Sequence, residues 1–394
     1  MQRMKLAVVS THPIQYYAPV FRALAAYDAL DVRVFYTWSQ AAESALFDHG
    51  FGAEVKWDIP LLDGYDHQFI RNVAVRAGSR HFNGIRNPTL IDDIEAWGPD
   101  AILVYGWNCQ SHLQAIRYFK GRVPVLFRGD STLLDPISWW RALLRRAFLR
   151  WLYGHVDLAI AVGGNNRDYF AWCGVPMQRI AFAPHSIDTQ RFAADAIEQE
   201  NHARDWRLEL GIPAEAVVFL FAGKLQKKKH PELLLDAFRS LRPGSHLIYV
   251  GSGEIECELK AQAGGFDNVH FLPFQNQSLM PVVYRLGNVF VLPSQGPGET
   301  WGLAMNEAMA TGRPIIASSR VGGARDLIQP ESTGWIFESG DRHALRRVLS
   351  QAADCGLAGL AAMGLAARAL SARWSTEESA QAIRDAVLTC RRCR

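Results

Sequence analysis

Residues 289–318 read VFVLPSQGPGETWGLAMNEAMATGRPIIAS, and they hold the pattern that decides the fold. The apolar run Val289–Leu292 is typical of a buried strand, and the Pro- and Gly-rich residues 293–298 predict a turn. Small residues over 302–311 predict a helix, and 315–318 predict a second buried strand. In a parallel sheet, the turn that follows such a strand is where ligands bind, because the next helix presents unpaired N–H groups there.

Two carboxylates bracket the start of the predicted helix, Glu299 before it and Glu307 within it. Backbone N–H groups at a helix start bind phosphate, and carboxylates accept hydrogen bonds from sugar hydroxyls. Because helical side chains tilt toward the N-terminus, we expect Glu307 to reach back toward the turn. The stretch therefore predicts a site for a ligand that carries both phosphate and hydroxyl groups.

Length and composition narrow the class of protein. At 394 residues, two domains are expected, since single cores stop growing near 250–300 residues. The net charge of +3 does not favour nucleic acid as a partner, and the six cysteines show no metal-ligand spacing. The apolar run in MQRMKLAVVS is too short for a signal peptide, and no stretch approaches 18 apolar residues. We therefore expect a cytoplasmic protein that does not span a membrane.

Strand and helix patterns alternate along the chain, which predicts an α/β fold of two Rossmann-like, doubly wound parallel-sheet domains facing a cleft. Residues 1–190 form the predicted first domain. The polar residues 191–214 lack strand signals and are predicted to be the linker. Residues 215–373 form the second domain, and 374–394 are expected to form a C-terminal helix that returns to the first domain.

Buried apolar runs place the individual strands. Residues 39–88 are predicted to be irregular. The first domain has six predicted strands, at 6–10, 31–38, 101–105, 123–127, 158–162 and 179–183. The second domain has five predicted strands, at 217–222, 245–250, 269–272, 289–292 and 314–317.

Four turns of the second domain follow predicted strands and are candidates for ligand contact. Gly223–Lys229, GKLQKKK, carries four lysines that can neutralise a diphosphate, although lysines alone are more typical of a solvated basic turn. Residues 251–254 lack the third glycine of a dinucleotide fingerprint, which disfavours a nicotinamide-binding enzyme. Residues 271–274, FLPF, could flank a base or belong to the core, and the fourth turn is 293–298.

Taken together, the turns resemble in order and spacing those of family 4 of the retaining glycosyltransferases, which have the GT-B fold. Gly223–Leu225 with Lys229 matches the family's G-R-L-x-x-x-K turn. Residues 250–254 match its VGxGP-like turn, and Glu299 and Glu307 match its E-x7-E motif. The resemblance covers essentially all of residues 215–345.

Further segments carry the resemblance, and two positions depart from it. Residues 321–328 and 333–335 match the family downstream, and 184–188, PHSID, look like its PNGVD segment. Lys224 stands where the family has arginine, which keeps the charge but loses the bidentate fork. The strand end 127–130, FRGD, does not match the family's first-domain histidine.

The resemblance implies a reaction. A sugar passes with retention from a nucleotide-diphosphate sugar, with a UDP-sugar as the expected donor, to a hydroxyl of a glycan, a lipid-linked glycan or a small molecule. Glu299, Lys224 and Lys229 are implied as catalytic, since the lysines would stabilise charge on the leaving diphosphate, which helps to deprotonate the acceptor on the same face. No D-x-D pair occurs in the sequence, so neither a metal nor another cofactor is expected. The implied donor-binding residues are Gly223, Gly251, Gly253, Glu254, Leu272, Pro273, Thr300, Trp301, Gly302, Leu303 and Glu307.

Acceptor-side candidates lie at strand ends of the first domain. His12, Gln15 and Tyr16 follow the first strand, and Arg128 and Asp130 follow the strand near 127. A histidine at such a place is a structural cap about as often as it is a ligand contact. The segments THPIQYYAP and LFRGDST indicate a bacterial polysaccharide-type subgroup.

Residues 137–153, ISWWRALLRRAFLRWLY, carry four arginines on one half of a predicted helix and apolar side chains on the other. One interpretation is a helix packed on the first sheet. The other is an interfacial helix that contacts anionic lipid at the inner face of the cell membrane, where a lipid-linked acceptor would reside.

Two alternatives to a transferase stay open at this point. A GT-B nucleotide-sugar epimerase would alter the donor sugar without any acceptor. A non-catalytic protein could retain only the nucleotide-sugar pocket, although the presence of Glu299, Glu307, Lys224 and Lys229 argues against such decay.

Overall fold

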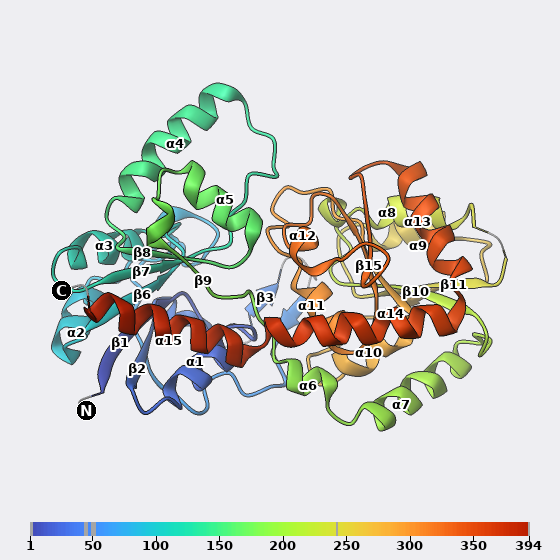
Figure 1. Cartoon of the computed structure of the whole chain (residues 1–394), viewed down its shortest axis with the longest axis horizontal. Helices are drawn as coiled ribbons and strands as arrows, with labels where there is room; N and C mark the ends of the chain where they lie inside the picture. The colour runs from blue at the N-terminus through green and yellow to red at the C-terminus, as the bar shows by residue number, and fades with distance from the viewer. Residues whose placement is uncertain (1–2, 43–45, 49–52, 242, 393–394) are drawn as a thin grey trace. The chain divides into compact units, whose positions relative to one another are not determined.

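The structure is a computed structural model that describes residues 3–42, 46–48, 53–241 and 243–392 (Figure 1). The chain divides into two compact units. The first unit comprises residues 1–46, 60–185 and 376–394, and the second comprises 47–59 and 186–375. A two-stranded sheet pairs β3 (Leu46–Asp48) with β4 (Ala53–Val55).

Within the described residues, the first unit contains a seven-stranded parallel sheet in the order β5-β2-β1-β6-β7-β8-β9. Its central strands are mostly apolar and almost wholly buried, as expected where helices cover both faces of a parallel sheet. The strands are β1 (Met4–Ser10), β2 (Leu30–Tyr36), β5 (Asp66–Phe69), β6 (Ala101–Tyr105), β7 (Val125–Arg128), β8 (Leu158–Ala161) and β9 (Ile180–Phe182).

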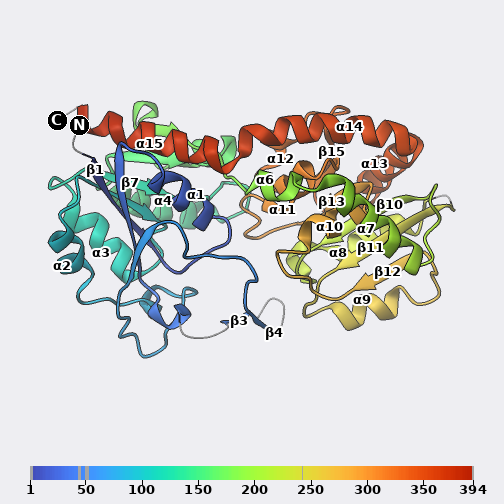
Figure 2. The same ribbon diagram turned by 90° about the horizontal axis from the view of Figure 1, so that it is seen from below.

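Helices cover both faces of this sheet. The helix α15 (Thr376–Arg392) packs beside α1 (Ala18–Ala25), and both bury apolar side chains against one face (Figures 1 and 2). The other face is covered by α2 (Leu90–Trp97), α3 (Gln110–Phe119), α4 (Trp139–Tyr153) and α5 (Gly164–Trp172). Short 3₁₀ turns lie at Ser39–Ala42, Phe82–Gly84 and Met177–Arg179. The predicted return of the C-terminal helix to the first domain is thus confirmed.

The second unit, over its own described residues, contains a six-stranded parallel sheet in the order β12-β11-β10-β13-β14-β15. Its strands are β10 (Val217–Ala222), β11 (Ser245–Val250), β12 (Val269–Leu272), β13 (Val289–Leu292), β14 (Ile315–Ser318) and β15 (Gly334–Phe337). The predicted pair of doubly wound parallel-sheet units is therefore confirmed.

The helices of this unit cover both faces of its sheet, and alternate side chains of β10 point toward one face or the other. Phe219 and Phe221 face a core shared with α8 (Pro231–Phe238), α9 (Glu256–Gln262) and α13 (Arg342–Asp354). The remaining helices are α6 (Thr189–Ala193), α7 (Ala196–Glu209), α10 (Met280–Leu286), α11 (Leu303–Ala310), α12 (Ala324–Leu327) and α14 (Gly356–Ser371). Among them, α10 packs on β10, and α11 packs on β13 and β14.

The strand order creates a topological switch point in each sheet. In the first sheet it lies between β1 and β6, and in the second it lies between β10 and β13, because the chain winds outward in opposite directions from these pairs. Ligands of doubly wound sheets bind at such a point, outside the carboxyl ends of the two strands. The turns after β1, β6, β10 and β13 are therefore the places where side chains can meet a ligand.

The predicted linker 191–214 folds differently from the expectation. It forms most of α6 and α7, and both helices belong to the second unit. The buried Arg285 of α10 donates hydrogen bonds to Gln199 Oε1 at 2.7 Å and to the Phe192 carbonyl at 3.1 Å. The sequence of residues 191–214 is polar because α7 buries little apolar surface, and these polar contacts attach the helix. The second unit accordingly includes residues 186–214 together with those from 215 onward.

Four short strands were missed. β3, β4 and β5 lie inside the segment 39–88 that was expected to be irregular, and β15 follows the last predicted strand. Among the described strands, β5 pairs only with β2, and its polar, half-exposed residues give a weak apolar pattern. β15 in turn pairs only with β14 among the strands described, although its residues GWIF are apolar and mostly buried. In addition, Asn276 donates to the Lys56 carbonyl at 2.7 Å, which attaches residues 53–59 to the second unit.

No single helix among the described residues is long and apolar enough to cross a membrane. The helices α13 and α14 meet the requirement of length and apolar composition only when taken together, and this pair is bent by 104°.

Candidate functional site

The structure brings together the lysine turn after β10 and the glutamate turn after β13. Lys229 Nζ lies 2.7 Å from Glu299 Oε2, and the Ser294 hydroxyl donates to the same oxygen at 2.9 Å. Both members of the ion pair are largely buried, with 18% of the Lys229 side chain and 11% of the Glu299 side chain exposed. The pair therefore lies at the switch point of the second sheet, where a ligand is expected.

Glu299 is held in its ionised form. Burial by itself would raise the pKa of this carboxyl, but the Lys229 ammonium, the Ser294 hydroxyl and the nearby Lys228 outweigh that effect and hold the pKa below its ordinary value. An ionised carboxylate with two oxygens can accept further hydrogen bonds beside those from Lys229 and Ser294. The site can thus accept hydroxyl donors from a ligand at neutral pH.

The loop that carries Glu299 is held by backbone contacts on two sides. The Gln295 amide N–H donates to the Lys228 carbonyl at 3.0 Å, which joins the glutamate turn to the lysine turn. On the other side, Gly322 N–H donates to the Glu299 carbonyl at 3.0 Å, and Gly323 N–H donates to the Trp301 carbonyl at 2.9 Å. These contacts position the carboxylate without using its side-chain oxygens.

Glycines in the neighbouring turns allow their backbones to approach. A Cβ on Gly251 would fall far inside van der Waals contact with the Gly223 carbonyl, and one on Gly253 would do so with the Leu225 carbonyl. Likewise, a Cβ on Gly322 would overlap the Thr300 carbonyl. The glycines of these turns therefore have a packing role, because they let the backbones of neighbouring strand-end turns come into contact.

Glu307 and Trp301 point into the second unit. Glu307 is 2% exposed, and its Oε2 accepts a hydrogen bond from the Tyr284 hydroxyl at 2.6 Å. Trp301 is buried, donates from Nε1 to Asn306 Oδ1 at 2.8 Å and packs on Trp374. Both side chains thus support the start of α11 from within.

The other predicted donor-side residues surround these two turns. Lys224, Thr300 and Leu303 are half-buried, whereas Pro273 is exposed. Gly302 has a φ of 88° and forms the N-cap of α11, a conformation that glycine adopts without strain. The backbone N–H of Lys227 donates to the Glu254 side chain at Oε1, at 3.4 Å, and Gly251 N–H donates to the Leu272 carbonyl at 3.0 Å.

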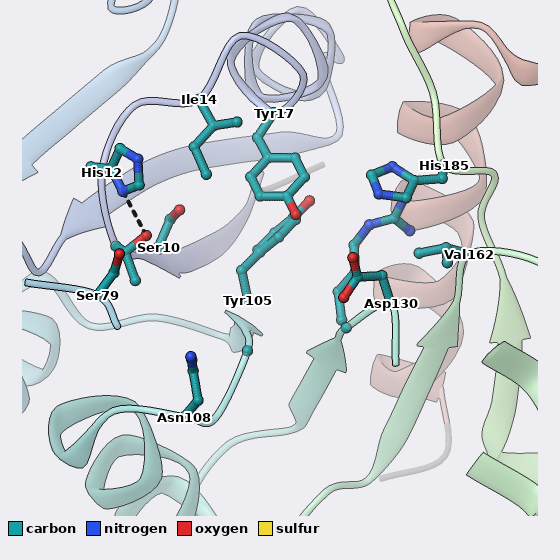
Figure 3. A pocket seen from close by; sticks show the side chains of 14 residues that line it. Ser10, His12, Ile14, Tyr17, Ser79, Tyr105, Asn108, Asp130, Val162 and His185 are labelled. Atoms are coloured by element: carbon teal, nitrogen blue, oxygen red, sulfur yellow. Dashed lines mark hydrogen bonds between the residues drawn. The ribbon is translucent and has the colours of Figure 1, made fainter. Parts of the chain in front are cut away.

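The first unit contains a cavity of about 270 Å³ at the carboxyl edge of its sheet (Figure 3). His12 follows β1, Asn108 follows β6, Asp130 follows β7, and His185 follows β9, so four strand ends contribute polar side chains. The complete lining is Ser10, Thr11, His12, Ile14, Tyr17, Ser79, Tyr105, Gly106, Asn108, Arg128, Gly129, Asp130, Val162 and His185.

Both histidines of the cavity are neutral at neutral pH. Burial lowers the pKa of His12 to about 4, and burial lowers that of His185 to about 4, with Asp130 acting against this shift and Arg128 adding to it. His12 Nδ1 shares a hydrogen bond with the Thr11 hydroxyl at 2.9 Å. Neutral imidazoles offer one donor and one acceptor each.

Only some of the predicted acceptor-side residues line this cavity. His12, Arg128 and Asp130 line the cavity, whereas Gln15 and Tyr16 do not belong to its lining. Sequence reasoning missed the other lining residues, among them Tyr17, Tyr105, Asn108 and His185. Positions just after a predicted strand would have indicated Asn108 and His185, but nothing local marks Tyr17, which approaches from the start of α1.

The arginine-rich helix α4 packs on the first sheet only through its end. Leu149, Leu152 and Tyr153 are buried, whereas Trp139 is 79% exposed and Leu144 is 64% exposed. The full set of exposed large apolar side chains on this helix is Trp139, Trp140, Leu143, Leu144, Phe148 and Trp151. A helix packed fully on the sheet would bury most of these side chains.

No three His, Cys, Asp or Glu side chains within the described ranges lie together in a way that could hold a metal ion.

The sequence matches two models of known protein families and is similar to curated proteins. A model described as "Glycosyltransferase Family 4" matches residues 20–191, and one described as "Glycosyl transferases group 1" matches 203–368. A D-inositol 3-phosphate glycosyltransferase from Xylanimonas cellulosilytica is 30% identical over 221 residues, which are 54% of this chain and 52% of that protein. The chain thus spans about half the length of the curated relatives it matches.

Solved structures share the fold over nearly the whole chain. Anabaena Alr3699/HepE in complex with UDP and glucose has a TM-score of 0.70 at 19% identity, with 98% of this chain and 100% of that chain covered. Sucrose-phosphate synthase from Thermosynechococcus elongatus has a TM-score of 0.72 at 20% identity, with 100% of both chains covered. Because the two family models together span most of the chain and the fold agrees with these structures, the chain belongs to the family-4 type of glycosyltransferases with the GT-B fold.

Proposed function

We propose that this protein transfers a sugar from a nucleotide-diphosphate sugar to a hydroxyl of an acceptor, with retention of configuration and without a metal ion. The observation that carries the proposal is the Lys229–Glu299 ion pair at the switch point of the second sheet. It joins the cation suited to a leaving diphosphate with the carboxylate suited to sugar hydroxyls. The names of a relative and a structural neighbour support glycosyl transfer, and the complex of another neighbour with UDP and glucose supports a nucleotide-sugar donor.

Donor binding would use both strand-end turns of the second unit. Glu299 accepts hydrogen bonds from hydroxyls of the transferred sugar, and Lys224 and Lys229 contact the diphosphate. An ammonium has three donors, so Lys229 can keep Glu299 and bind a phosphate oxygen together. The N–H groups of Thr300 to Leu303 add donors near the same oxygens. We take a UDP-sugar as the donor, which the UDP complexes of a structural neighbour support.

The proposed step balances without a co-reactant. The bond between the anomeric carbon and the diphosphate oxygen breaks, and a bond from that carbon to the acceptor oxygen forms on the same face. The proton of the acceptor hydroxyl passes to the leaving diphosphate. Lys224 and Lys229 lower the barrier by stabilising the charge that develops on the diphosphate. The acceptor would be a glycan, a lipid-linked glycan or a small molecule, with the first unit as the acceptor-binding part of the chain.

A donor screen tests this proposal. The intact protein is incubated with UDP-, GDP-, ADP- and dTDP-sugars in EDTA, with and without a mixture of glycans, and released nucleoside diphosphate is measured. Release with one donor and an α-linked product from an α-linked donor support the proposal. A new donor sugar formed without acceptor would instead indicate an epimerase, and donor binding without any turnover would indicate a binding protein. Activity that EDTA abolishes would contradict the metal-independent step.

We further propose that α4 contacts an anionic membrane surface at the inner face of the cell membrane. Its apolar side chains are exposed, and Arg141, Arg145, Arg146 and Arg150 lie among them with no acidic residue between Asp135 and Asp157. An exposed apolar stripe beside arginines is typical of an interfacial helix that binds anionic lipid. This arrangement would bring the first unit to a lipid-linked acceptor.

Vesicle binding tests the membrane contact. The protein should sediment with phosphatidylglycerol-containing vesicles and not with neutral phosphatidylcholine vesicles. Reversing the four arginines of α4 to glutamate should abolish sedimentation, whereas reversing the exposed Arg342, Arg346 and Arg347 of α13 should leave it largely intact. Binding that survives the α4 reversal, or that both reversals reduce equally, would contradict a specific role for α4.

A further inference from the structure

Two buried tryptophans of the second unit pack on each other beside the turn that carries Glu299. Trp301 follows Glu299 by two residues, and the centroid of its ring lies 4.9 Å from that of Trp374, at an interplanar angle of 41°. The two residues are 3% and 7% exposed, respectively. The Trp301 indole N–H also donates to Asn306 Oδ1 at 2.8 Å, so α11 holds the ring through a polar contact and Trp374 adds an aromatic one.

Two glycines join this ring to the Glu299 backbone. Gly323 N–H donates to the Trp301 carbonyl at 2.9 Å, and Gly322 N–H donates to the Glu299 carbonyl at 3.0 Å. A Cβ on Gly323 would lie 2.9 Å from Cε2 of the Trp301 ring, so the ring packs directly on this backbone. Because protein interiors are close-packed, removal of the Trp374 ring would leave a void into which Trp301 could move, and the Glu299 backbone would move with it.

Trp374 is itself held by its backbone. It ends the 3₁₀ turn Ala372–Trp374, and its carbonyl accepts a hydrogen bond from Ile187 N–H at 3.4 Å. The next residue, Ser375, forms an isolated parallel bridge with Ile187. These contacts join the two ends of the segment 186–375 of the second unit. Trp374 therefore presents its ring to Trp301 from a fixed position.

We propose that Trp374 is a positioning residue that acts through Trp301 to hold the turn carrying the Glu299 carboxylate. The proposal rests on the proposed glycosyl transfer, because Glu299 is the group assigned there to the transferred sugar. A misplacement of about 1 Å in a reacting group, caused by a change far from the chemistry, can lower a rate by roughly 100-fold. Trp374 thus contributes to the reaction without contacting the substrate.

Another tryptophan of the same unit serves as a matched control. Trp335 of β15 is also 7% exposed, and it packs in the core shared with α13. If Trp374 only filled space, Trp374→Leu and Trp335→Leu would have the same effect on the donor turn and on activity.

Hydrogen exchange of the intact chain, followed by mass spectrometry, examines the turn without any substrate. The amides of Gly322 and Gly323 report on it, because they donate to the carbonyls of Glu299 and Trp301. We expect Trp374→Leu to speed exchange at these amides by at least about 10-fold, Trp374→Phe to retain most of the protection, and Trp335→Leu to leave it unchanged. Unchanged exchange in Trp374→Leu, or equal acceleration in Trp335→Leu, would overturn the proposal. If the leucine variant does not fold, Trp374→Met takes its place.

Kinetics of the same variants, measured below the unfolding temperature of each, separate positioning from packing. We expect kcat/KM for the donor to fall by about 10-fold or more in Trp374→Leu and to stay within about 3-fold of the wild type in Trp374→Phe. Trp335→Leu should keep nearly wild-type kcat/KM despite a similar loss of Tm. Equal losses of kcat/KM in the two leucine variants would contradict the role of Trp374 and leave the transferase standing. A wild-type chain that turns over no donor would refute the proposed transfer, and the exchange rates would still decide whether Trp374 holds the turn.

Discussion

Lys229 Nζ and Glu299 Oε2 lie 2.7 Å apart, although one residue follows β10 and the other follows β13. These strands are neighbours in the second sheet, at the point where its winding reverses. The ion pair therefore results from topology, because only the strand order places the two turns side by side. It links the group that would stabilise the leaving diphosphate to the group that would orient the sugar.

Replacing Glu299 with glutamine should lower kcat by roughly 100-fold or more, a loss typical of removing one electrostatic contact in a transition state. The variant keeps the size of the side chain but cannot hold the Lys229 ammonium by charge. Initial rates with the donor found in the screen would measure the effect. Glu258→Gln, on the exposed face of α9, serves as the control and should retain wild-type rates. Equal activity of the two variants would remove Glu299 from the proposed step.

Gly322→Ala should weaken both the fold and the donor site, because the added Cβ would overlap the Thr300 carbonyl. The loop 299–301 would have to shift, and with it the Glu299 carboxylate. We expect a loss of a few kcal/mol in the free energy of unfolding, as found for overpacked sites, and weaker donor binding by calorimetry. Gly359→Ala, within α14 and facing the exposed Cys355, should instead change stability by less than about 1 kcal/mol. A donor affinity unchanged in Gly322→Ala would show that the loop tolerates the shift.

Arg285→Met should destabilise the second unit by roughly 3 kcal/mol, since it leaves several buried acceptors without their charged donor. Arg285 donates to Gln199, Pro281 and Phe192, and thereby attaches α6 and α7 to α10. Urea unfolding would measure the loss, and limited proteolysis should show earlier cleavage within 189–209. Arg204→Met, exposed on α7, is the matched control. A stability loss of similar size in both variants would argue against the special role of Arg285.

The buried histidines should make stability fall in mild acid. The pKa of both His12 and His185 is about 4 in the folded state against 6.5 as the ordinary value, so only the unfolded state takes up their protons between these limits. The free energy of unfolding is therefore unaffected by them above about pH 6.5 and decreases as the pH falls toward 4, by up to about 1.4 kcal/mol per pH unit for each histidine.

Thermal unfolding between pH 7.5 and 4.5 would check this dependence. His12→Gln and His185→Gln should each show a shallower decline of Tm with falling pH than the wild type. His343→Gln, on the exposed face of α13, should follow the wild-type curve. Parallel curves for all four proteins would indicate that other groups cause the acid sensitivity.

The sequence by itself determined the alternation of elements and the family. Val289–Leu292 is apolar throughout and the other central strands are mostly so, because helices cover both of their faces, and such runs are visible without a structure. Glycine and lysine spacing in the strand-end turns was equally visible. Short edge strands such as Asp66–Phe69 were not, because one-sided pairing leaves a mixed pattern. Residues 191–214 were read as a linker because their attachment depends on polar contacts made by Arg285, a residue remote in sequence.

Only the tertiary structure decided which strand-end residues share a site. Sequence order does not determine that β10 lies beside β13 or that β1 lies beside β6. The pairing of Lys229 with Glu299, and the meeting of His12, Tyr17, Tyr105 and His185 around one cavity, follow from those neighbours. A local pattern reports how each segment is buried, whereas the contact between two turns depends on the order of strands in the sheet. The stretch 289–318 thus predicts a ligand site, and the fold places Lys229 beside its Glu299.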